Sequence, residues 1–208
     1  RYLSLCAARR AARLARLAEK RTRILVVQGW DFNEGRCSHA FPSDYAGKYA
    51  GAYVFRPGSK LLELTIGESG VTEQTQLDDP TGMLRDPDVS YDGERLLFSW
   101  RKAETTDDFH LHEMDLSNGA VRQLTNGRGF ADIEGCYLPD GGIVMGTTAS
   151  YQSVPCWHGR KLVSNLYLMN AERSQLRQLC FDQDHDWNPT VLPTGQVLYQ
   201  RWDYTGIN

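Results

Sequence analysis

The feature that most constrains this chain is a repeated pair of strands joined by a tight turn. The repeat occurs in residues 87–100, 135–147 and 189–202. In each copy the turn contains a glycine, and these glycines (positions 93, 141 and 195) are 48 and 54 residues apart. Repetition of one supersecondary unit at this spacing is typical of β-propellers, in which every blade is a four-stranded sheet.

A second repeated segment supplies the outer strands of each blade. Residues 109–125 match residues 164–180, and a weaker copy covers residues 59–77. The predicted blade units are about 23–77 (without its innermost strand), about 87–125, about 133–180, and a final two-stranded hairpin over 188–202. We therefore predict an all-β fold, a partial β-propeller of about three four-stranded blades over residues 23–208. Since propellers close with four to eight blades, we expect the chain to be part of a larger ring with exposed edge strands.

Residues 1–22 have a different pattern and predict one basic amphipathic α-helix ahead of the propeller. Leu3, Leu14 and Leu17 recur at helical spacing, without glycine or proline. Residues 1–23 hold eight basic side chains and one acidic side chain, whereas the whole chain has a net charge of −3. Such a helix can bind an anionic membrane or nucleic acid, but its narrow apolar stripe favours packing on the parent domain. No apolar run approaches the ~20 residues that span a bilayer, so we predict no transmembrane segment.

Familiar catalytic motifs are missing from the sequence. It has no G-x-S-x-G, H-E-x-x-H, P-loop or G-x-G-x-x-G motif, and its five cysteines include no C-x-x-C-H pair for covalent haem. No self-contained active site is recognised, so whether the protein is an enzyme stays open. The acidic body of the chain would repel phosphates, and we expect no nucleic-acid partner.

Several longer strings resemble a known family. They are Arg85–Gly93 (RDPDVSYDG), Phe98–Lys102 (FSWRK), Phe109–Asp115 (FHLHEMD), Glu134–Gly141 (EGCYLPDG), Ser164–Tyr167 (SNLY) and Tyr199–Tyr204 (YQRWDY). The repeats look like those of TolB-type six-bladed propellers. The strings are similar to the middle domain of hydrazine synthase alpha-subunit-related proteins, and the similarity is closest over residues 85–204.

The resemblance implies a propeller inside a large exported chain, in the periplasm or otherwise outside the cytoplasm. In that family the enzyme joins ammonium and nitric oxide into hydrazine at c-type haems. Because this sequence has no haem-attachment motif, haem would lie only in neighbouring domains of the parent. The expected partners are therefore other domains of the parent chain or separate proteins.

Polar residues concentrate where the chain enters the inner strands and leaves the second strands. If these loops share one face of the propeller, they form a ligand-binding face near its axis. Its predicted members are Asp86, Asp88, Arg101, Asp132, Glu134, His185, Asp186 and Arg201. Converging carboxylates repel one another unless a cation or arginine compensates them. Two interpretations remain open: a divalent metal or basic ligand, or structural pairing of these acids with Arg85, Arg101 and Arg201, which we favour.

The loop over 149–164 offers a second candidate site. Cys156 and His158 are two residues apart, and a thiolate with an imidazole can ligate zinc. A tetrahedral site would need further ligands, such as His185 or Asp132. His110 and His112 alternate on one predicted strand, but the counterpart of His112 is Tyr167, which favours packing.

Two functions follow from these patterns. The first is a scaffold and interaction surface in a larger exported protein. The alternative is a propeller face that contributes to a metal or redox-cofactor site of a multidomain, haem-dependent oxidoreductase-like assembly.

Overall fold

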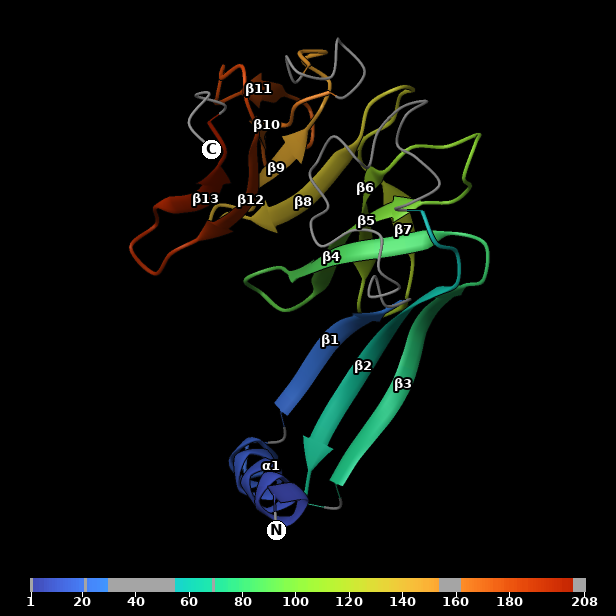
Figure 1. The fold of residues 1–208 in the computed structure, drawn as a ribbon, viewed down its shortest axis with the longest axis vertical. Coiled ribbons are helices and arrows are strands. Elements are labelled where there is room, and N and C mark those ends of the chain that lie inside the picture. Colours follow the sequence, from blue (N-terminus) through green and yellow to red (C-terminus); the bar gives the residue numbers. More distant parts are fainter. Residues whose placement is uncertain (1, 21, 30–54, 69, 154–161, 204–208) are drawn as a thin grey trace.

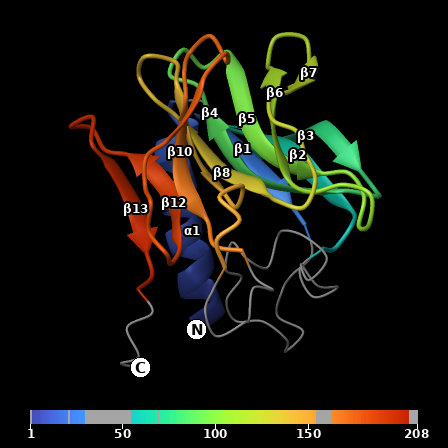
Figure 2. The same cartoon turned by 90° about the horizontal axis from the view of Figure 1, so that it is seen from above.

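The protein is a partial β-propeller preceded by one helix, which confirms the predicted fold class. The computed structural model describes residues 2–20, 22–29, 55–68, 70–153 and 162–203. Within these residues the strands form four antiparallel sheets (Figure 1). Seen from above, the β1–β3 sheet and the β12–β13 sheet lie on opposite sides, with the two four-stranded sheets between them (Figure 2).

The two central sheets have four strands each, in chain order. One consists of β4 (Met83–Val89), β5 (Arg95–Arg101), β6 (His110–Asp115) and β7 (Val121–Gln123). The next consists of β8 (Asp132–Tyr137), β9 (Ile143–Thr147), β10 (Asn165–Met169) and β11 (Leu176–Gln178). The flanking sheets are β1 (Thr22–Gln28), β2 (Ser59–Gly67) and β3 (Gly70–Asp79), and β12 (Asp186–Val191) with β13 (Val197–Arg201).

The three repeated glycines occupy equivalent turns. Gly93, Gly141 and Gly195 have φ angles of 74°, 86° and 82°, a backbone conformation that glycine adopts without a Cβ clash. Each donates its N–H to the carbonyl three residues earlier, at 2.8 to 2.9 Å. The spacing of the glycines in the sequence therefore corresponds to one turn geometry used three times.

Each inner strand is also interrupted by a β-bulge at an equivalent position. Asp86, Glu134 and Asn188 lie at the bulges in β4, β8 and β12, with φ angles of 55°, 56° and 55°. Non-glycine residues seldom adopt a positive φ, and Asp and Asn do so most readily. The residue after each bulge residue is Pro87, Gly135 or Pro189. Proline and glycine are both common at bulges, because the bulged residue makes no ladder hydrogen bond.

The bulge residues link neighbouring sheets to one another. The Asp86 carboxylate accepts a hydrogen bond from the backbone N–H of Glu134 at 3.1 Å. The Glu134 carboxylate in turn accepts from the backbone N–H of Asn188 at 2.7 Å. We call these two contacts the bulge clasp. A parallel link joins Asp88 to the backbone N–H of Tyr137 at 2.7 Å.

Apolar side chains fill the spaces between successive sheets. Leu61, Leu84, Leu96, Phe98 and Met114 pack between the β1–β3 sheet and the β4–β7 sheet. Leu97, Leu111, Tyr137, Ile143, Met145 and Met169 pack between the two four-stranded sheets. Gly135 lets β8 come close, because a Cβ there would lie 2.7 Å from Leu97. Each fully buried Leu or Phe contributes roughly 2 kcal/mol to stability.

The helix α1 (Tyr2–Ala18) lies at the far end of the β1–β3 sheet (Figure 1). Thr22, the first residue of β1, donates a side-chain hydrogen bond to the helix at the carbonyl of Leu17, at 2.9 Å. No side chain of the helix is buried, and Tyr2 and Leu3 are 79% and 81% exposed. Leu14 and Ala18 are half-buried and the helix contacts β2, so the packing expected for its apolar stripe is only partial within the described residues. Among the described helices, none has the length and apolar character needed to cross a bilayer.

The bulge clasp yields a stability prediction. Glu134→Ala removes the acceptor for the Asn188 N–H and should lower the free energy of unfolding by about 2–3 kcal/mol. Glu134→Gln keeps a side-chain oxygen and should lose less. The measurement is urea denaturation followed by circular dichroism. The control is Glu94→Ala, an exposed turn residue expected to change stability by less than about 0.5 kcal/mol. Equal losses for Glu134→Ala and Glu94→Ala would contradict the role of the clasp.

Candidate functional site

The predicted ligand-face residues separate into distinct environments. Asp86, Asp88 and Glu134 take part in hydrogen bonds between sheets. The other five lie at the ends of strands or in the adjoining loops. These five are Arg101, Asp132, His185, Asp186 and Arg201.

Arg85 lies between the two acids of the bulge clasp. Its Nε is 2.6 Å from Asp86 Oδ2, and its Nη2 is 2.9 Å from Glu134 Oε1. Burial raises the pKa of Glu134, and the Arg85 charge offsets only part of that effect. Burial likewise raises the pKa of Asp88, although the Tyr137 N–H stabilises its charged form. The Arg85 pairing is the arrangement expected from the structural interpretation of these acids.

Arg101 is buried and holds a loop. Its guanidinium donates to the carbonyls of Ala103, at 3.2 Å, and Glu104, and it lies over the Phe55 ring at 5.0 Å. Burial lowers the pKa of Arg101, although nearby acids, Asp108 first among them, oppose the shift. These contacts position the chain that follows β5.

The Asp132 carboxylate forms a buried pair with His110. His110 Nδ1 lies 3.1 Å from Asp132 Oδ2, and its Nε2 lies 3.1 Å from the carbonyl oxygen of Gly127. Both partners are acceptors, so both ring nitrogens must carry a hydrogen for both bonds to form. Protonated His110 can make both bonds, as an imidazolium beside the Asp132 carboxylate.

The pKa of His110 agrees with this assignment. Burial acts to lower it, but the hydrogen bond and the charge of Asp132 outweigh burial and raise the pKa above 6.5. His112, two residues along the same strand, has the opposite shift. It is surrounded by Phe98 and Trp100, and burial lowers its pKa from 6.5 to about 4.

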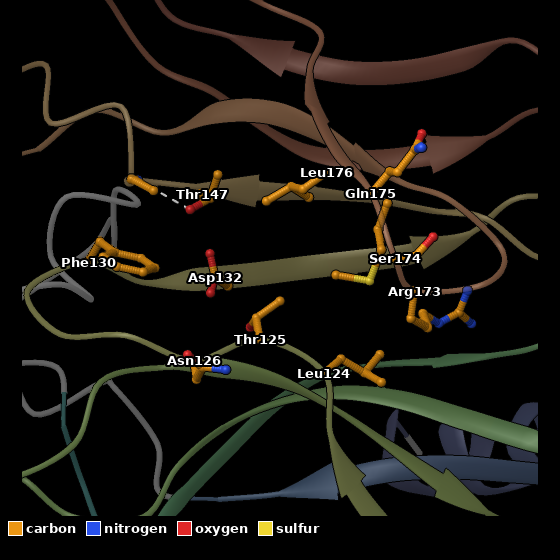
Figure 3. A pocket seen from close by; sticks show the side chains of 12 residues that line it. Leu124, Thr125, Asn126, Phe130, Asp132, Thr147, Arg173, Ser174, Gln175 and Leu176 are labelled. Carbon is orange, nitrogen blue, oxygen red and sulfur yellow. Dashed lines mark hydrogen bonds between the residues drawn. The ribbon is translucent and has the colours of Figure 1, made fainter.

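A cavity of about 270 Å³ lies beside Asp132. Figure 3 shows Asp132, Thr125 and Thr147 on neighbouring segments, with Phe130 at one side and Arg173 at the other. The remaining lining residues are Leu124, Asn126, Ala149, Met169, Ser174, Gln175 and Leu176. This cavity combines an acidic and hydroxyl-bearing region with apolar walls, so it can hold a small molecule that carries a hydrogen-bond donor.

Asp186, at the start of β12, belongs to a second acidic group. Ligand atoms of Cys180, Asp182 and Asp186 all lie within 4.8 Å of one another. Burial and the neighbouring Asp182 carboxylate raise the pKa of Asp186 to about 7. Burial, with the Asp186 charge, also raises the pKa of the Cys180 thiol.

The last two predicted residues flank this group. Arg201 Nη2 lies 2.7 Å from Asp182 Oδ1, and its Nε donates to Asp203 Oδ1 at 2.8 Å. His185 is buried, and its Nδ1 accepts the backbone N–H of Ser164 at 3.1 Å. The His185 ring centroid lies 5.8 Å from that of Trp187. Arg201 thus faces the acidic group, whereas His185 has a backbone partner.

Cys156 and His158, the predicted zinc ligands, lie outside the described residues. Three residues of interest were not selected from the sequence. His110 was assigned to packing, and Cys180 and Asp182 were not considered. The signal was present in the repeats, where His110 aligns with Asn165 and Cys180 aligns with Thr125.

The repeats place different residue pairs at one structural position, where an outer strand meets the next inner strand. Between the first and second sheets the pair is Leu61 and Leu84, both buried in one apolar cluster. Between the second and third it is His110 and Asp132. Between the third and fourth the equivalent residues are Asn165 and Asp186. The same backbone bond recurs, from Asp132 N–H to the residue 109 carbonyl and from Asp186 N–H to the residue 164 carbonyl, both at 2.8 Å.

Comparisons with known proteins bear on the fold. No family model matches the sequence, and no curated protein matches it. Among solved structures, the chain resembles a protein described as TolB from Agrobacterium tumefaciens, with a TM-score of 0.54 and 18% identity over 72% of this chain and 48% of that one. It also resembles the hydrazine synthase of Kuenenia stuttgartiensis, with a TM-score of 0.58 and 14% identity over 86% of this chain and 27% of that one.

The chain thus spans less than half of the TolB protein and about a quarter of the hydrazine synthase chain. At these identities the similarity is one of fold. It confirms, at that level, the resemblance to TolB-type and hydrazine synthase propellers that the sequence motifs indicated.

The buried His110–Asp132 pair yields a second prediction. His110→Asn leaves the Asp132 carboxylate without its cation and should lower the free energy of unfolding by about 3 kcal/mol. Replacing both residues by leucine copies the Leu61–Leu84 pair and should restore stability to within about 1 kcal/mol of the unmodified chain, because no buried charge remains. Urea denaturation measures both. If the double variant is no more stable than His110→Asn, the loss in His110→Asn does not come from breaking the His110–Asp132 ion pair.

The two histidines yield a prediction about pH. The pKa of folded His110 lies above 6.5, so its stabilising contribution is complete below pH 6.5 and is lost as pH rises through the folded pKa. The stability difference between the unmodified chain and His110→Asn should therefore shrink with rising pH. His112 titrates near 4 when folded, so its contribution is lost as pH falls from 6.5 towards about 4. Denaturation series with His110→Asn and His112→Phe should give opposite pH trends, and parallel trends would contradict the assignment.

Proposed function

We propose that this chain is a scaffold segment of a propeller in a larger exported protein, and that it receives further strands at the outer edge of β13. The observation that carries the proposal is the exposure of this strand. Its counterparts in the two four-stranded sheets, β5 and β9, are almost wholly buried, whereas β13 has no buried residue. Leu198 on β13 is 55% exposed.

Pairing in the other sheets supports a specific occupant. β5 pairs with β4 on one side and β6 on the other, and β9 pairs likewise with β8 and β10. Within the described residues, β13 pairs with β12 alone. An exposed edge of unpaired backbone groups is a template for another strand. We therefore propose a β-strand from the parent chain, antiparallel to β13, as the occupant.

The use of the acidic residues also supports a scaffold. Asp86, Asp88 and Glu134 accept backbone hydrogen bonds from the following sheet, so their carboxylates hold sheets together. An exported location, which the family resemblance implies, forms part of this proposal.

Amide hydrogen exchange tests the proposal. Backbone amides of β13 that point away from β12 should exchange rapidly in the 208-residue chain and at least about tenfold more slowly in the full-length parent, because an added strand protects the edge. Amides of β9, which is paired on both sides, serve as the internal control and should change little. Equally rapid exchange of β13 in both proteins would overturn the proposed pairing.

A further inference from the structure

The junction between β11 and β12 carries three side chains that can ligate a metal ion. The Cys180 sulfur and one carboxylate oxygen each from Asp182 and Asp186 lie within 4.8 Å of one another. We infer that these three residues form a binding site for a divalent transition-metal ion, and that zinc suits it best. This inference is independent of the proposed scaffold function.

The surroundings of Asp186 suit a cation. Asp186 is 0% exposed, and neither of its carboxylate oxygens has a hydrogen bond with good geometry among the described residues. The groups that act on it electrostatically include the Asp182 carboxylate, the Cys180 thiol and the Arg201 guanidinium. A buried carboxylate whose nearest side chains are a second carboxylate and a thiol is costly unless a cation or a metal compensates it. One of its oxygens lies within 4.8 Å of the Cys180 sulfur and of an Asp182 oxygen.

At the junction between β6 and β8, a cationic side chain compensates the carboxylate at the equivalent position. There the equivalent carboxylate, Asp132, is paired with the His110 imidazolium. At the later junction the histidine is replaced by Asn165. The Asn165 amide reproduces one bond, donating to the Asp182 carbonyl at 3.1 Å as His110 Nε2 does to Gly127, but it supplies no charge to Asp186.

Arg201 supplies only part of the missing charge. Its Nη2 is paired with Asp182 Oδ1 at 2.7 Å, and its Nε is bonded to Asp203. Neither contact involves an Asp186 oxygen. One guanidinium therefore faces three carboxylates, which leaves room for a further positive charge beside Asp186.

The donor set favours zinc over harder ions. A thiolate with two carboxylates suits a borderline ion, whereas magnesium and calcium prefer oxygen donors alone. Zinc ligands at about 2.0–2.3 Å lie about 3.3–3.8 Å apart in a tetrahedron, so the three side chains need to close by about 1 Å. The fourth position would be left to water. Cys180 and Asp182 are partly exposed, which gives an ion access from solvent.

Hydrogen bonds from the surroundings hold the backbone at two of the ligands. The Cys180 carbonyl accepts a hydrogen bond from Gln178 at 2.7 Å, and the Asp182 carbonyl accepts one from Asn165. Arg201 fixes one Asp182 oxygen and leaves the other for the ion. Such outer contacts are typical of metal sites, where they set ligand direction.

The test uses the 208-residue chain, freed of metal with a chelator and kept reduced. Zinc affinity is measured by competition with a chromophoric chelator, and cobalt is used as a spectroscopic probe of thiolate ligation. We expect one equivalent of cobalt to give a thiolate-to-metal charge-transfer band. Cys180→Thr, which introduces the residue found at the equivalent position 125, should abolish the band and weaken zinc binding by at least about 100-fold.

Control variants distinguish binding at this site from binding by other cysteines, and from loss of binding through misfolding. Cys6→Ser and Cys156→Ala should retain the cobalt band and the zinc affinity. Asp186→Asn should leave the metal-free melting temperature unchanged or raised, because it removes a buried charge, yet abolish the rise in melting temperature that zinc gives the unmodified chain. A band that survives in Cys180→Thr, or an equal zinc-induced rise in the unmodified chain and Asp186→Asn, would overturn the inference.

Discussion

The arrangement of this propeller segment depends on a backbone conformation that three residues share. Asp86, Glu134 and Asn188 adopt a positive φ at a bulge in successive inner strands. At Glu134 and Asn188 the backbone N–H donates to the side chain of the bulge residue in the preceding sheet. Because these bonds connect backbone in one sheet to a carboxylate in another, they fix the relative position of sheets that otherwise contact through apolar side chains. Arg85 pairs with both carboxylates and offsets part of the negative charge that the arrangement buries.

The sequence predicted the strands and their turns, whereas the bulges and the contacts between sheets were not predicted. Turn glycines and repeat spacing were sufficient for the fold, since period-two alternation and tight turns are local properties. Asp86 and Glu134 were expected in the loops that enter the inner strands, with pairing to Arg85 as the favoured interpretation, and the structure has that pairing. The bulge changes the direction of each residue, and no pattern in one sequence signals a positive φ at an Asp or Glu. His110 was assigned to packing because Tyr167 is the counterpart of its neighbour His112. Its partner Asp132 is 22 residues away and is brought to it only by the tertiary fold.

Comparison of the junctions shows one framework with three kinds of chemistry. The position holds an apolar pair at Leu61 and Leu84, an ion pair at His110 and Asp132, and an amide beside an acid at Asn165 and Asp186. The backbone hydrogen bonds around the two polar junctions are the same. A propeller can therefore vary the charge at a junction without changing its strand pairing, and chemistry at one junction says little about the next.

The bulge clasp also has a direction along the chain. In both contacts the side chain belongs to the earlier sheet and the N–H to the later one. During synthesis on the ribosome, the acceptor is therefore made before the donor that needs it. Each new sheet can meet a preformed partner as it emerges, which favours stepwise folding from the N-terminal side and limits the time for which an inner strand is exposed to wrong pairings.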